Sequence, residues 1–310
     1  MISELFSVTV LIGILASGIR LATPYLYAAI GETFSQKSGV LNLGVEGQML
    51  LGAFAAFYVA LTTGNLWLGM LAAMIVGAAM GLAMAYVTVN LQAQQGISGI
   101  GFYLFGLGMS DLLFQKLMGT VETVKGFPRI FIPGLSDIPL LGEIFFNHNP
   151  LVYLAYLLVP VAWFVLNKTT LGLKIRSVGE NPDAADSLGV NVARVRYFTI
   201  TLGGTLSGIA GASLSIALLN VFQQNMTSGQ GFIAVALVYF GAWRPAGVLG
   251  GALLFSMVNS LQLWMQVKNI PIPPDIAVML PYVLTILALV VTVSRVRAPS
   301  ALTKPFEREE

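Results

Sequence analysis

The chain has 310 residues, of which 56% are hydrophobic and 10% are charged, with a net charge of +2 at pH 7 and no cysteine. A typical soluble domain carries about a quarter charged residues, so this composition excludes an ordinary soluble protein. The small net charge argues against nucleic acid as a partner, and the absence of cysteine excludes disulfides and thiolate chemistry.

Long apolar segments predict an all-α, polytopic transmembrane helical bundle that sits in a lipid bilayer, with about eight to ten membrane segments. We expect residues 1–310 to form a single transmembrane domain. The segments lie at about 5–30, 40–63, 65–90, 96–116, 150–167, 198–222, 230–243, 246–266 and 275–294.

Two of these segments are irregular. The first contains Arg20 and Pro24, which suits either one kinked span or a span followed by a half-helix. The segment 230–243 is too short for a full crossing, so we expect a broken or re-entrant helix there.

Glycine pairs within the spans predict close packing of helices. Gly77 and Gly81 are four residues apart, as are Gly204 and Gly208. This spacing lets helix backbones approach closely. We expect ordinary packing between membrane helices here, in preference to a specific dimerisation motif.

The basic residues predict which hydrophilic intervals face the cytoplasm. The interval 168–197 and the tail after Val293 are the two most basic ones, so the positive-inside rule places both in the cytoplasm. The interval 117–149 is long, rich in proline and balanced in charge, and we expect a periplasmic loop there. The single span at 150–167 connects the two sides, in agreement with this assignment.

A polar, glycine-rich stretch, Ser38 to Gln48, interrupts the second apolar segment. Such a pattern suits a broken helix whose polar side chains line a passage. Because a charge at the bilayer centre is costly, Glu46 is expected to face a pathway, or else to cap a helix start or to pair with Arg20.

Aromatic and amide side chains could also line a pathway, because nucleobases and sugars are held by stacking and by amide hydrogen bonds. The alternatives are helix packing for the aromatic residues and a solvated outer loop for the amides. The candidate pathway residues are Asn42, Glu46, Gln48, Phe102, Phe105, Asn220 and Gln223.

A short helix with clear end signals is predicted within the cytoplasmic interval. Asn181 can cap its first amides, Pro182 fits the first helical position, and Asp183 suits the positive end of the helix dipole. Gly189 supplies the C-terminal stop. A helix this short is not stable alone, so it is either held by a partner or part of a solvated connecting loop.

Few groups could carry catalysis. His148 is the only histidine, and the sequence has no nucleophile elbow, no zinc-protease motif and no phosphate-binding loop. We therefore expect no enzymatic activity, no catalytic residue, no metal site and no cofactor.

Three blocks of sequence between about residues 30 and 250 carry a resemblance to a known family. They are Gly31-Glu32 with Ser38-Gly39-Val40-Leu41-Asn42-Leu43-Gly44-Val45-Glu46-Gly47, Arg176 to Ala185 with Gly189, and Gly229 to Ala236. Together they resemble permease subunits of bacterial ABC importers of the ribose/branched-chain amino acid superfamily. Within it they are most similar to the nucleoside and simple-sugar branch.

The resemblance gives the short helix a role. Asp183-Ala184-Ala185 with Gly189 is similar to the Glu-Ala-Ala-x-x-x-Gly loop of ABC importers, with Asp in place of Glu. In that family the helix docks on a cytoplasmic ATPase and transmits its closure to the membrane spans. The coupling residues implied are Asn181, Pro182, Asp183, Ala184, Ala185, Asp186 and Gly189.

The resemblance also implies the partners and the location. A separate ATPase subunit would hydrolyse ATP, an extracytoplasmic substrate-binding protein would deliver the solute, and a second permease would complete a heterodimer. This chain resembles the shorter of two such permeases. The expected location is the bacterial cytoplasmic (inner) membrane, and the expected function is uptake of nucleosides, or of simple sugars, by alternating access.

The alternative function is an ion-gradient-coupled secondary carrier. It would use Glu46, Asp111 and Arg20 as its coupling relay. That hypothesis leaves the capped cytoplasmic helix unexplained.

Overall fold

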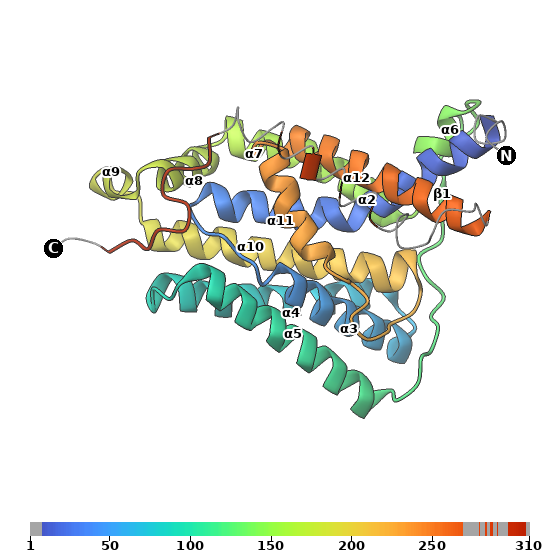
Figure 1. The fold of residues 1–310 in the computed structure, drawn as a ribbon, viewed down its shortest axis with the longest axis horizontal. Helices are drawn as coiled ribbons and strands as arrows, with labels where there is room; N and C mark the ends of the chain where they lie inside the picture. Colours follow the sequence, from blue (N-terminus) through green and yellow to red (C-terminus); the bar gives the residue numbers. More distant parts are fainter. Residues whose placement is uncertain are drawn as a thin grey trace.

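The protein is an elongated helical bundle, shown as a computed structural model in Figure 1. The structure describes residues 8–268, single residues between 279 and 290, and residues 297–307. In this part of the chain, 7 helices are long and apolar enough to cross a membrane, and a shorter apolar helix spans Gln230–Phe240. The expected all-α polytopic bundle is confirmed. The last predicted segment, 275–294, lies outside the described residues apart from those single positions.

The long helices follow the predicted segments in order. They are α2 (Val8–Lys37), α3 (Val45–Thr63), α4 (Leu66–Ala85), α5 (Gln95–Leu117), α7 (Pro150–Lys168), α10 (Val192–Ser213) and α12 (Pro245–Val267), with the short α11 (Gln230–Phe240) before α12. α4 and α10 continue into π-helical turns, η1 (Tyr86–Asn90) and η2 (Leu214–Leu218). Helix α2 continues through Pro24 to Lys37, so the first segment is one helix that extends beyond its predicted end.

The connecting intervals contain the smaller elements. The interval 117–149 holds α6 (Leu141–Phe145) and an antiparallel pair of strands, β1 (Ile130–Phe131) and β2 (Asn147–His148). The interval 168–197 holds α9 (Pro182–Ser187), as predicted, and also α8 (Thr170–Glu180), which was not predicted. Helix α8 forms because the side chain of Thr169 caps it and its buried face packs on the bundle.

Helix α10 lies in the middle of the bundle and packs against α2, α3 and α4. A Cβ atom on Gly77 would strike the carbonyl oxygen of Gly204, and one on Gly204 would strike that of Gly77. A Cβ atom on Gly81 would lie 2.8 Å from the carbonyl oxygen of Ile200. The glycine pairs therefore bring α4 and α10 of the same chain together, as ordinary helix packing requires.

The two connecting intervals lie at opposite ends of the bundle. Figure 1 shows α8, α9 and the C-terminal segment at one end, and β1 and α6 at the other. The backbone amide of Ala301 donates to the carbonyl oxygen of Gly179 at 2.9 Å, so the tail contacts α8 directly. The two basic intervals thus share one end, whereas the side of the membrane that each end faces stays a prediction.

Candidate functional site

Helix α9 has the ends that the sequence predicts. The side-chain oxygen of Asn181 accepts a hydrogen bond from the amide of Ala184 at 3.0 Å, and Pro182 is the first helical residue. Gly189 has φ +82°, a left-handed conformation that glycine adopts without strain. Ala185 is buried against the rest of the chain. The local sequence therefore determines this helix.

An open apolar groove runs between α8 and α9. It has a volume of about 570 Å³. On its margins, the side chains of Leu173 and Leu188 are 60% and 85% exposed. The predicted topology places this end of the bundle in water, where exposure of leucine side chains costs free energy. Its lining includes Thr170, Leu173, Lys174, Ser177, Ala184 and Leu188. This surface has the character of a docking site for another protein.

Glu46 holds the start of the short helix α11. Its carboxylate accepts hydrogen bonds from the hydroxyl of Thr227 at 2.6 Å and from the amides of Gly229 at 2.7 Å and Gly231 at 2.5 Å. A negative charge is favoured at this end of a helix. The alternative pairing of Glu46 with Arg20 is wrong, whereas the expectation that Glu46 caps a helix start is confirmed, for α11.

The glycine at position 231 lets the two helices approach. A Cβ atom there would lie 2.6 Å from the backbone nitrogen and Cα of Glu46. A larger residue would push α11 away from the first turn of α3. The close approach thus explains the glycine at position 231 in the Gly229–Ala236 block.

The other end of α11 is held by polar side chains of α2. The indole nitrogen of Trp243 donates to Oε1 of Gln36 at 2.8 Å, and the amide of Gln36 donates to Glu32 at 3.1 Å. Ala242 and Trp243 both have positive φ, 54° and 55°, which strains this turn. The ring of Trp243 packs edge-on against Tyr239 of α11 with centroids 4.8 Å apart. Both ends of the short helix are therefore fixed to α2 and α3.

Part of the buried turn at residues 38–44 takes its hydrogen bonds from side chains, whereas the amides of Ser38, Gly39 and Val40 donate to backbone carbonyl oxygens of α2. The amide of Leu41 donates to Gln95 at 2.8 Å, and that of Asn42 donates to Glu32 at 2.9 Å. The side chain of Asn42 donates to Gln48 at 3.1 Å. Buried amides that have no backbone carbonyl as partner need such side chains. The predicted break lies between α2 and α3, and not inside a span.

A comparison with protein families identifies the chain. The family described as "Branched-chain amino acid transport system / permease component" matches residues 14–289. The chain belongs to this permease family. It is accordingly a multi-pass protein of the cytoplasmic membrane and a membrane component of an ABC transporter, which is not itself an enzyme.

Curated relatives of the permease cover nearly its whole length. It is 39% identical to the putative glucose ABC transporter permease TsgC13 of Haloferax volcanii, over 96% of this chain and 98% of that protein. It is 39% identical to the guanosine permease NupQ of Bacillus subtilis, over 92% of this chain and 93% of NupQ. It is 37% identical to the nucleoside permease NupC of Lactococcus lactis, over 93% of this chain and 94% of NupC. No solved structure matches.

The two bacteria also have a second, more distant permease that matches. The guanosine permease NupP of Bacillus subtilis and the nucleoside permease NupB of Lactococcus lactis are each 26% identical to this chain. Permeases of this family work with an ATPase and a substrate-binding protein, and these pairs suggest two permeases per transporter.

The structure places the predicted pathway residues of the permease in three regions. Asn42, Glu46 and Gln48 are at most 1% exposed and lie together at the start of α3. Phe102 lies beside them, because a Cβ atom on Gly44 would come within 2.9 Å of it. Phe105 is 51% exposed and lines, with Phe102, an apolar groove of about 600 Å³ between α4 and α5.

Asn220 and Gln223 lie elsewhere, beyond the end of η2. The carbonyl oxygen of Asn220 accepts from the amide of Val124, so this segment pairs with the interval 117–149, and Gln223 is exposed. Between them, Phe222 is buried against Phe54 of α3, with ring centroids 5.3 Å apart. The amide cluster therefore sits at the end of the bundle opposite α9.

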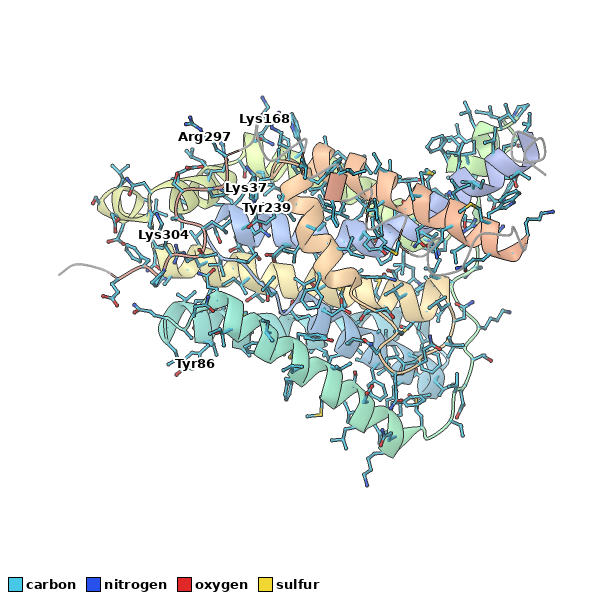
Figure 2. All side chains as sticks on the ribbon, viewed as in Figure 1. Lys37, Tyr86, Lys168, Tyr239, Arg297 and Lys304 are labelled. Atoms are coloured by element: carbon cyan, nitrogen blue, oxygen red, sulfur yellow. The ribbon has the colours of Figure 1, made fainter. Side chains whose placement is uncertain are left out.

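Several residues of this arrangement were not predicted. They are Gln36, Thr227, Trp243 and the tail from 297 to 307, whose contacts reach across the chain. The spacing of Glu32 and Gln36, four residues apart on one helical face, was the available signal for the first of them. Figure 2 shows Lys37 at the end of α2 and Tyr239 on α11 in this region.

Proposed function

We propose that this permease is the membrane subunit of an ATP-driven importer that takes up nucleosides by alternating access, with simple sugars as the near variant. The relatives named for guanosine, nucleosides and glucose support this substrate class. The capped helix α9, with exposed Leu188 beside an apolar groove, is the observation that carries the coupling to an ATPase.

Physical reasoning favours a protein partner for α9. A helix of 6 residues is too short to be stable unless other groups hold it. Ala185 anchors it to this chain, whereas Ala184, Leu188 and Gly189 remain exposed on its outer side. Small and apolar residues on one exposed surface suit close docking into a groove. We assign the coupling role to Asn181, Pro182, Asp183, Ala184, Ala185, Asp186 and Gly189.

The same proposal fixes the topology. The interval 168–197 is the cytoplasmic coupling loop, and the interval 117–149 is the periplasmic loop that meets the substrate-binding protein. Residues 1–310 form one transmembrane domain. The separation of α9 from β1 and α6 along the bundle supports this orientation (Figure 1).

A second permease is part of the proposed assembly. Helix α5 contacts the bundle along one side and leaves Ile97 and Leu104 72% and 56% exposed. The chain covers 93% of NupQ but 74% of NupP, so it is of the NupQ type and a partner of the NupP type would complete the heterodimer.

The proposed substrate path follows the polar and aromatic residues at membrane depth. Asn42, Glu46 and Gln48 are buried, and Glu46 is bonded to the start of α11, so movement of α11 would open this region to a solute. Phe102 and Phe105 would then offer stacking surfaces, and Asn220 and Gln223 would lie toward the outer entrance.

Two substitutions of Gly189 test the coupling. A Cβ atom at this position meets nothing within 4 Å, so a larger side chain has room in the isolated permease. Gly189→Arg and Gly189→Ala share the cost of about 1–2 kcal/mol for a left-handed backbone, and only the arginine adds bulk toward a partner. We expect Gly189→Arg to abolish uptake and to lower ATPase co-purification about tenfold, whereas Gly189→Ala keeps most of both.

The readouts are co-purification of the ATPase in mild detergent and uptake of labelled guanosine and glucose. If uptake and ATPase co-purification fell equally in both variants, the cause would be backbone strain at position 189 and not blocked docking. Normal ATP-dependent uptake by Gly189→Arg would refute the coupling role. Uptake that needs an ion gradient and no ATP would favour the secondary carrier instead.

A further inference from the structure

The C-terminal segment returns to the end of the bundle that carries α8 and α9. Figure 2 shows Arg297 and Lys304 there, at the end where α2 finishes with Lys37. Ala301 is buried, and Leu302 and Phe306 pack against the hydrophobic core. The segment is therefore an ordered part of the fold at this end. We call residues 299–306 the strap.

One side of the strap is bonded to α8, next to the cap of α9. The amide of Ala301 donates to the carbonyl oxygen of Gly179 at 2.9 Å. The hydroxyl of Ser300 donates to the carboxylate of Glu180 at 2.9 Å, and the amide of Ser300 donates to the same oxygen at 3.4 Å. Since Asn181 follows directly and caps α9, the strap holds the base of the coupling helix.

The other side of the strap is bonded to the buried turn at 38–44. The amide of Thr303 donates to the carbonyl oxygen of Gly39 at 3.1 Å. Arg196 of α10 donates to the carbonyl oxygens of Ser38 and Lys304, each at 3.2 Å. The guanidinium group thus joins the strap to the end of α2 through α10.

Two glycines make this junction compact. Gly39 has φ +92°, and a Cβ atom there would lie 3.0 Å from both the carbonyl oxygen of Ala301 and the guanidinium of Arg196. A Cβ atom on Gly179 would strike the carbonyl oxygen of Lys37. The end of α8, the turn and the strap therefore touch through their backbones, so a displacement of one is passed to the others.

Backbone strain indicates that the strap is held firmly. Thr303 has φ +66°, which is unfavourable for a β-branched residue. Such a conformation persists when the surrounding contacts determine it. The bonds of Ala301, Thr303 and Lys304 on either side supply those contacts.

We infer that the strap is a positioning segment that makes the coupling helix and the turn at 38–44 move as one unit. From the turn the path continues through the amide of Asn42 to Glu32, and from Glu32 through Gln36 to Trp243 at the end of α11. A movement of α9 would thereby reach the short helix that covers the proposed path. This inference rests on the proposed docking of α9 to an ATPase.

The matched variants Thr303→Pro and Thr303→Gly test the strap. Proline lacks the amide that donates to Gly39 and cannot adopt positive φ, whereas glycine keeps the amide and relieves the strain. The measurements use the assembled transporter with its ATPase and binding protein in liposomes. They are uptake of labelled guanosine, ATP hydrolysed per guanosine taken up, ATPase co-purification, and amide exchange of residues 177–187.

We expect Thr303→Pro to raise amide exchange at 177–187, to keep the ATPase bound, and to lower uptake about tenfold with more ATP hydrolysed per solute. Uptake and the ATP hydrolysed per solute in Thr303→Gly should match those of the wild type within about twofold. Normal uptake by Thr303→Pro despite raised exchange would overturn the inference. Loss of the ATPase from Thr303→Pro alone would overturn it too, because the strap would then support docking and not transmission. Absence of an ATPase from the wild type would refute the proposed function instead.

Discussion

Glu46→Gln isolates the contribution of one carboxylate to the placement of α11. In the wild type, one carboxylate oxygen accepts from Thr227 and Gly229, and the other accepts from the amide of Gly231. Glutamine has nearly the same shape, but an amide nitrogen replaces one of these oxygens. That nitrogen is a donor and cannot accept from Gly231, so a buried N–H group loses its partner.

The expected cost follows from these bonds. A buried N–H group left without a partner costs about 1–3 kcal/mol. Loss of the negative charge at a helix start adds about 0.3–1 kcal/mol. A total of about 1.3–4 kcal/mol changes the local opening equilibrium of α11 by a factor of about 10 to 900. The start of α11 should therefore open far more often in the variant.

Amide hydrogen exchange at Gly229 and Gly231 in purified protein measures this opening. Asp111→Asn is the matched control, because it removes a carboxylate that does not hold α11. Asp111 lies on α5, and its Oδ1 atom has no hydrogen-bond partner in the described part of the chain. We expect faster exchange in Glu46→Gln and unchanged exchange in Asp111→Asn, with the first variant still present in the membrane. Wild-type exchange in Glu46→Gln would refute the assignment of Glu46 as the anchor of α11.

Two further predictions concern packing and pH. Gly204→Ala places a Cβ atom against the carbonyl oxygen of Gly77, so it should destabilise the protein by about 1–3 kcal/mol. The control is Gly250→Ala, which should not destabilise it, because nothing lies within 4 Å of a Cβ atom at that position. Equal apparent Tm values of the two variants would contradict this prediction. Burial lowers the pKa of His148 below its usual 6.5, and Arg20 and Arg129 lower it further, although its hydrogen bond to Ile144 opposes the shift. Because the folded protein favours the neutral imidazole, His148 contributes stability above about pH 6.5, and this contribution is lost as the pH falls below that value. The protease resistance of residues 117–149 should therefore drop between about pH 7.5 and 5.5 in the wild type but not in His148→Gln.

The sequence alone predicts the elements whose signals are local. The cap of α9 joins the side chain of Asn181 to an amide three residues later, so a short stretch of sequence is enough to identify it. The long spans follow from the length of their apolar runs, and the shortness of α11 follows from its early stop. The glycine spacing in α4 and α10 predicted close packing because two glycines four residues apart lie on the same face of a helix.

Only the tertiary structure decides what the buried polar groups bind. Glu46 lies more than 180 residues before its partners Thr227, Gly229 and Gly231, and the sequence left a pathway role and a structural role, as a helix cap or in an ion pair, both open. The strap reaches Gly39 and Gly179 through backbone atoms, so these two contacts have no compositional signature. Composition and periodicity determine which segments enter the membrane, but the hydrogen bonds between distant segments depend on which backbones the packed helices bring together.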